Sequence, residues 1–139
     1  MIMKFIIFLI TILISHKTFS ADLEVSLKAV RNAKGQLRIA VFNDPKEFPR
    51  GDEISSLNIK AKSGDVTALI KGMKPGIYAI AIHHDENFNK QMDTNFIGLP
   101  KEGYGFSNDA RVFLGPPNFS AASFVIDDVF KKINIHIIY

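Results

Sequence analysis

Apolar and polar residues alternate over several short segments of this chain. The alternation has a period of two residues in segments 23–29, 37–41, 57–61 and 133–139. A period of two predicts strands with one buried face, and no segment has a helical period long enough for a bundle. The pattern therefore predicts an all-β domain.

Short turn-like segments separate the predicted strands. Residues 32–35 predict a hairpin turn into segment 37–41, because Gly35 can adopt the positive φ that closes it. Residues 63–65 predict a second hairpin, which leads into residues 66–70. Pro75 and Gly76 fit the two central positions of a type II turn.

The segment after that turn, residues 77–82, is apolar at almost every position. Such a run predicts a central strand that is covered on both faces. Between residues 83 and 118 the sequence predicts one strand at 110–114 and otherwise a long loop, and long loops are usually functional or disordered. Residues 120–124 predict one helical turn capped by Ser120. We therefore expect an antiparallel β-sandwich, immunoglobulin-like or transthyretin-like, with six to seven strands and one long loop.

The chain begins with a different pattern. Lys4 precedes a run of about ten apolar residues, and small residues follow at Thr18 and Ser20. This layout predicts a secretory signal peptide at residues 1–20 and a single domain at 21–139, although cleavage after Ala21 is also compatible. The run is shorter than the roughly twenty residues of a membrane span.

Charge and composition narrow the localisation and the partners. The chain has 17 basic and 14 acidic residues, and removal of Lys4 and Lys17 with the signal peptide leaves a net charge of +1. This near-neutral balance argues against nucleic acid as a partner. The absence of cysteine excludes disulfides and the lipid-attachment cysteine of bacterial lipoproteins. We expect a periplasmic or secreted protein, without a membrane span in its mature form and not a lipoprotein.

Residues 85–93 carry an oxygen donor at every odd position. These donors are Asp85, Asn87, Asn89, Gln91 and Asp93. The spacing matches the first nine positions of a calcium loop, with Glu102 available to complete the shell. Lys90 replaces the usual glycine at position six, and Phe96 replaces the bidentate glutamate at position twelve. The alternative is that Asp and Asn form Asx turns here and satisfy backbone groups without a metal.

Other candidate chemistry is weaker. His83 and His84 are adjacent, so on a strand they point to opposite faces and cannot easily share one zinc or copper ion. No serine or cysteine has the surroundings of a catalytic nucleophile, so no catalytic residues are assigned. Two of the acids Asp85, Glu86, Asp93 and Glu102 would suffice for glycoside hydrolysis.

Glycines and aromatic residues interleave at 103–106. Tyr104 and Phe106 are candidates for contacts to a ligand or partner, such as a sugar ring. The alternative, which loop length favours, is that both rings anchor a long loop to the sandwich.

The segments 78–87 and 93–108, with Pro117 and Phe119, resemble a family of small exported bacterial proteins catalogued as domain of unknown function 2141. Members usually have glycines inside the acidic loop, where this chain has Phe88 and Lys90. The resemblance covers nearly all of the expected mature chain. It implies an exported β-sandwich, and it brings no activity, substrate or catalytic residues.

Together these features favour an exported, non-enzymatic binding or structural module whose long loop, residues 85–108, is its working surface. Its partner would be an unidentified protein or carbohydrate, and calcium is the one cofactor that the sequence suggests. The alternatives are a small hydrolase acting on carbohydrate through the loop carboxylates, and a subunit of an envelope assembly.

Overall fold

The computed structural model describes residues 19–139, so residues 1–18 of the predicted signal peptide lie outside it. The signal peptide and its cleavage site stay predictions. Within the described residues, helices are all too short to cross a membrane.

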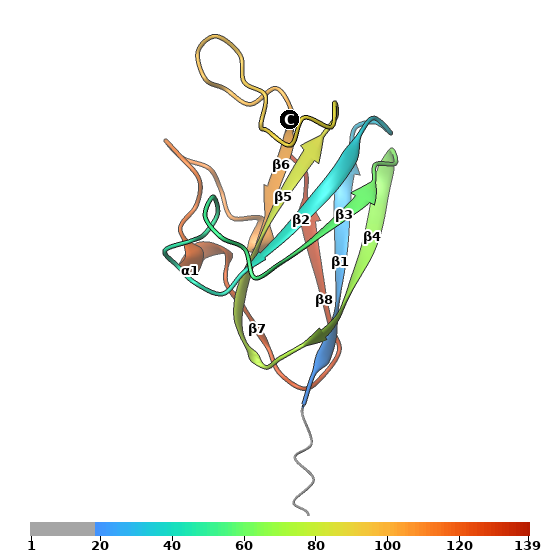
Figure 1. Cartoon of the computed structure of the whole chain (residues 1–139), viewed down its shortest axis with the longest axis vertical. Coiled ribbons are helices and arrows are strands. Elements are labelled where there is room, and N and C mark those ends of the chain that lie inside the picture. Colours follow the sequence, from blue (N-terminus) through green and yellow to red (C-terminus); the bar gives the residue numbers. More distant parts are fainter. Residues whose placement is uncertain (1–18) are drawn as a thin grey trace, which may run out of the picture.

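Eight strands form two sheets (Figure 1). The three-stranded sheet has the order β4-β1-β8 and contains β1 (Ala21–Val30), β4 (Gly64–Met73) and β8 (Lys131–His136). The five-stranded sheet has the order β3-β2-β5-β6, with β7 also paired to β5. Its strands are β2 (Gln36–Phe42), β3 (Ser55–Lys60), β5 (Gly76–Asp85), β6 (Gly103–Phe106) and β7 (Phe124–Ile126). The all-β sandwich is confirmed, with eight strands instead of six or seven.

Both predicted hairpins are wrong. The turn at 32–35 carries the chain from β1 in one sheet to β2 in the other, and the turn at 63–65 carries it from β3 to β4 in the opposite direction. β2 pairs with β3 across the long loop 43–54, and β1 pairs with β4. Alternation shows that a strand has one buried face, but it carries no information about which strand lies beside it.

The inner faces of the two sheets enclose the main core. The largest fully buried side chains in it are Leu23, Leu27, Leu37, Ile39, Ile80, Ile126 and Ile135. β1 and β8 pair in parallel, so the sandwich is not antiparallel throughout as the sequence predicts. β8 follows β7 of the other sheet and does not form a hairpin with β1. Beyond β8, the backbones of Tyr104 and Ile138 exchange two hydrogen bonds of 3.0 and 2.8 Å. The C-terminal segment therefore joins the edges of the two sheets.

β5 lies at the centre of the five-stranded sheet, as its apolar run predicts. It pairs with β2, β6 and β7. Its outward-facing residues are covered by a second apolar cluster that contains Phe42, Phe48, Phe106 and Ala122. The type II turn is wrong, because Gly76 is not among the described residues with positive φ, whereas Gly72 has φ +69°.

Three further local predictions between residues 103 and 126 are corrected. Residues 110–114 are not a strand, and Leu114 has φ +54°. The helical turn is α1 (Phe119–Ala122), capped by the Asn118 side chain, which accepts a hydrogen bond from the Ala121 N–H, in place of Ser120. β6 and β7 were not expected, since each is at most four residues long and lacks a clear alternation of apolar and polar side chains. Segments this short depend on their tertiary neighbours to form strands.

Candidate functional site

β6 shows why glycines and aromatic residues alternate at 103–106. A Cβ on Gly105 would lie 2.8 Å from the His136 carbonyl oxygen and 2.9 Å from the Ile135 side chain. The glycines therefore face the C-terminal segment, where the two sheets come too close for a side chain. Tyr104 and Phe106 point to the opposite face and join the second apolar cluster, so they lie on a strand and not in a loop. Phe106 is buried and packs edge-on against Phe48, with ring centroids 5.9 Å apart.

A cleft of about 730 Å³ lies over this outer face of the five-stranded sheet. Its floor comes from β2, β5 and β6, where Ala40, Ala81 and Phe106 contribute small or flat surfaces. Its walls come from the loops that follow β2 and β5 and from the segment before α1. Wall residues with apolar side chains are Pro49, Met92, Leu99, Pro100, Val112, Leu114 and Pro116.

The basic side chains that line the cleft are Arg38, Arg50, Lys90 and His83, and no carboxylate of residues 19–139 lines it. Arg38 forms an ion pair with Glu53, and His83 lies 2.8 Å from Glu102. Among residues 19–139, Arg50 and Lys90 form no ion pair with an acid. The cleft therefore combines an apolar lining with two basic side chains that have no ion-pair partner within residues 19–139.

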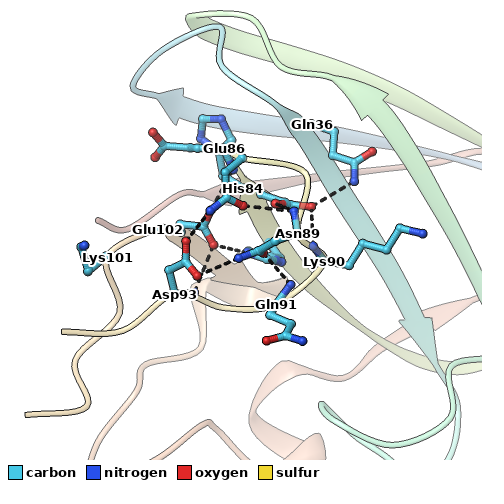
Figure 2. Close-up of polar contacts among 12 residues, drawn as sticks. Gln36, His84, Glu86, Asn89, Lys90, Gln91, Asp93, Lys101 and Glu102 are labelled. Carbon is cyan, nitrogen blue, oxygen red and sulfur yellow. Dashed lines mark hydrogen bonds and ion pairs between the residues drawn. The ribbon is translucent and has the colours of Figure 1, made fainter. Parts of the chain in front are cut away.

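The acidic loop forms one wall of this cleft, and Figure 2 shows how its polar groups are connected. Asp85 is the last residue of β5 and is 1% exposed. Its carboxylate accepts hydrogen bonds of 3.1 Å from the Gln36 side chain and from the backbone N–H groups of Asn89 and Lys90. Burial raises the pKa of Asp85, but these hydrogen bonds outweigh it and hold the pKa below 3.8. Asp85 thus closes the turn at the start of the loop.

Three of the other predicted metal ligands, Asn87, Asn89 and Asp93, form side-chain hydrogen bonds within the loop. The side-chain oxygens of Asn87 and Asn89 accept hydrogen bonds from N–H groups two residues ahead, which is the Asx-turn geometry. Their amide nitrogens donate to the two carboxylate oxygens of Asp93, at 2.6 and 2.8 Å. Gln91 is exposed, and only its backbone N–H takes part. Five donors therefore lie in one loop, and two of them, Asn87 and Asn89, have the Asx-turn geometry of the alternative.

Glu102 connects the end of the loop to its beginning. It is 4% exposed, and its carboxylate accepts hydrogen bonds from the backbone N–H groups of Glu86 and Asp93 as well as from the His83 ring. Within the described residues, no three His, Asp or Glu side chains are grouped as a metal site would require. Calcium binding by this loop stays a prediction.

His83 and His84 point to opposite faces of β5, as adjacent residues on a strand must. His84 is fully buried, and its Nε2–H donates to the Lys34 carbonyl oxygen at 2.8 Å. Its Nδ1 forms a 2.7 Å hydrogen bond with the Tyr139 hydroxyl. The same hydroxyl accepts a hydrogen bond from the Arg31 N–H. His84 therefore holds the C-terminus against the β1–β2 turn.

Glu86 fixes the same turn from the acidic loop. Its carboxylate accepts hydrogen bonds from the Arg31 and Asn32 side chains, at 2.8 and 3.0 Å. Burial raises the pKa of Glu86, and the contacts with Asn32 and Arg31 outweigh it and hold the pKa below 4.5. Arg31 also lies over the Tyr139 ring, 4.4 Å from its centroid. Burial raises the pKa of Tyr139 above 10.0, against the lowering effect of Arg31.

The four acids considered for hydrolysis thus gather at one end of the five-stranded sheet. Asp85, Glu86, Asp93 and Glu102 each have both carboxylate oxygens in hydrogen bonds or ion pairs of the loop. None of them lines the cleft. These contacts give each acid a structural role, and hydrolysis stays an untested alternative.

Comparison with known proteins gives one match. Residues 25–134 match the family described as uncharacterized protein conserved in bacteria, DUF2141. The chain belongs to the DUF2141 family. No curated protein and no solved structure matches it.

In this DUF2141 protein the acidic loop needs unusual backbone conformations. Phe88 has φ +61° and Lys90 has φ +63°, in the left-handed region that favours glycine. These are the two positions at which the resemblance to DUF2141 leads us to expect glycine. The loop therefore keeps a glycine-type backbone although its side chains are larger.

The sequence did not identify Arg38, Arg50 or Lys90 as site residues of this DUF2141 chain. They come from β2 and from two separate loops, so no motif in the sequence connects them. One signal was present: a domain of this size with two long loops after neighbouring strands has room for a cleft between them.

Proposed function

We propose that this DUF2141 protein is an exported, non-enzymatic binding module that holds a small ligand in its outer cleft. The observation that carries the proposal is the cleft itself, whose 730 Å³ falls within the range of ligand pockets, roughly 300–1,000 Å³. Its floor belongs to a paired sheet and its walls to loops, which is the usual division between a rigid scaffold and a binding surface.

The predicted working loop supports this assignment. Seven lining residues come from segment 85–108: Lys90, Met92, Gly98, Leu99, Pro100, Tyr104 and Phe106. The hydrogen bonds of Asp85, Asp93 and Glu102 give the loop a defined shape next to the cleft. The hydrogen-bonded polar side chains of the loop would thus hold it in one conformation, and its apolar side chains would contact the ligand.

The predicted signal peptide supports export, and the occurrence of the family in bacteria is compatible with a periplasmic or secreted protein. Because the loop acids are engaged in structural contacts, we assign them no catalytic role.

The proposal is tested with the uncharged fluorophore Nile red and the mature protein, residues 21–139. We expect saturable binding with a blue-shifted emission, because an apolar cleft removes the dye from water. The variant Ala81→Phe fills the cleft floor and should abolish binding. Thr67→Phe places the same side chain on the exposed face of β4, away from the cleft, and should bind normally.

If Ala81→Phe fails to fold by circular dichroism, the double variant Met92→Ser and Leu99→Ser replaces it. Both residues are in an exposed part of the loop, so this change alters the cleft wall and leaves the core intact. No saturable binding by the wild type, or equal binding by a folded cleft variant, would reject the proposed function.

A further inference from the structure

The charges around the cleft restrict which ligand it can take; this inference rests on the proposed function. Arg50 lies in the loop after β2 and Lys90 in the loop after β5, so the two cations approach the cleft from different walls. Both are exposed. Figure 2 shows the Lys90 side chain extending away from the hydrogen-bonded acids of its own loop.

The other two basic side chains of the lining already have acidic partners. Arg38 is neutralised by Glu53, and the His83 ring is bound by Glu102. Neither of these glutamates lines the cleft. Among the described lining residues, a ligand would therefore meet two cations without an ion-pair partner and no carboxylate, which favours an anion and disfavours a cation.

The rest of the lining is apolar. Met92, Leu99, Val112 and Leu114 line the walls, and Leu114 is 97% exposed. Apolar side chains exposed around a concave site are removed from water when an apolar ligand occupies it. The ligand should therefore combine an apolar body with an anionic group.

The backbone N–H groups around the cleft bear on whether the anionic group is a phosphate or a carboxylate. Phosphate sites commonly use a helix N-terminus or free backbone N–H groups, and no residue of α1 lines this cleft. The N–H groups of Lys90, Gly98 and Leu99 already donate to Asp85 and Asn95. The backbone of the loop after β5 therefore offers an anion few donors, and the Arg50 and Lys90 side chains supply the positive charge. A guanidinium can bind a carboxylate through two hydrogen bonds, as it can a phosphate, so both anions enter the test.

We propose that the cleft binds an amphipathic carboxylate of the fatty-acid class, with its apolar chain against the cleft walls and its carboxylate between Arg50 and Lys90.

Four ligands with the same alkyl chain test this proposal by displacement of Nile red: decanoate, decanol, decyltrimethylammonium and decyl phosphate. At low salt we expect decanoate to bind about tenfold tighter than decanol, and the ammonium compound to bind weakest. Added salt should reduce the difference between decanoate and decanol. Equal or tighter binding of decanol or the ammonium compound would overturn the proposal, and tighter binding of decyl phosphate than of decanoate would overturn the carboxylate assignment.

Variants of Arg50 and Lys90 test whether these two side chains cause the preference for decanoate. Arg50→Gln and Lys90→Gln should each weaken decanoate binding about threefold, as expected for exposed ion pairs, and should weaken it more than they weaken decanol binding. Lys60→Gln removes an exposed cation from β3, outside the cleft, and is the matched control. Unchanged decanoate affinity in both cleft variants would reject this inference. Because Nile red would still bind, the proposed function would survive that result.

Discussion

At the scale of single residues, the acidic loop depends on two non-glycine residues in left-handed conformations. Phe88 and Lys90 both have φ just above +60°. A side chain in this conformation costs roughly 1–2 kcal/mol relative to the ordinary helical region. The hydrogen bonds of Asp85 to the loop backbone hold the conformation despite this cost.

Phe88 offers a direct test because its side chain is 63% exposed and loses little packing when it is replaced. Phe88→Gly should raise the free energy of unfolding by about 1 kcal/mol, measured by urea denaturation, since glycine removes the strain but adds some unfolded-state entropy. Phe88→Ala removes the same ring and keeps a Cβ, so it should give no gain. Equal stabilisation by both variants would point to the exposed ring as the cause, not the backbone.

At the scale of elements, residues 131–139 link the two sheets, and we call this C-terminal segment the clasp. β8 pairs with β1 in one sheet, and Ile138 then exchanges hydrogen bonds with Tyr104 in the other. Tyr139 completes the clasp through its contacts with His84 and Arg31. The C-terminal segment can lie this close to β6 because β6 has glycines there. A Cβ on Gly103 would lie 2.4 Å from the Tyr139 ring.

Tyr139→Phe tests the clasp. It leaves the buried His84 Nδ1 without its hydrogen-bond partner, so we expect a loss of about 1–3 kcal/mol in the free energy of unfolding. Nitrogen NMR should show a proton on Nε2 of His84 in the wild type, because its partner there is the Lys34 carbonyl oxygen. Tyr104→Phe is the control, since the Tyr104 hydroxyl makes no hydrogen bond within residues 19–139 and its loss should cost little. Similar losses in the two variants would argue against a specific role of the Tyr139 hydroxyl.

At the scale of the whole molecule, the shifted pKa values at the loop end of the sandwich make the free energy of unfolding depend on pH. The pKa values of Asp85 and Glu86 lie below 3.8 and 4.5, so the unfolded chain takes up protons first as the pH falls. Their contribution is complete above the unfolded pKa values and is lost as the pH falls through the folded ones. For Tyr139 the pKa is raised, so its contribution is lost as the pH rises above 10.0.

Urea denaturation at a series of pH values checks this prediction. Stability should be constant near neutral pH and should decline below about pH 4. Asp85→Asn should lower stability at neutral pH and flatten the acid decline, whereas Asp128→Asn, in the exposed β7–β8 connection, should leave both unchanged. An acid decline as steep in Asp85→Asn as in the wild type would show that other groups cause it.

The fold class and the chemistry of single segments could be predicted from the sequence. Alternation at 23–29 and 37–41 depends only on which side of a strand meets water, so it indicates strands without any partner. The same holds for β5, whose apolar run requires cover on both faces, and for Asn87 and Asn89, whose Asx turns are local. These properties are determined by neighbours in the sequence.

Strand pairing, β6 and the cleft were decided by tertiary structure. Two chains with identical alternation can pair in different orders, because the pattern specifies a buried face and not a neighbour. From the sequence alone, Gly105 is expected to be a flexible loop residue. In the structure, His136 and Ile135 lie too close to it for a side chain. Arg50 and Lys90 are forty residues apart in sequence and become parts of one site only because β2 and β5 lie side by side. A site built between loops is set by the arrangement of the strands that carry them, which is information that local sequence does not contain.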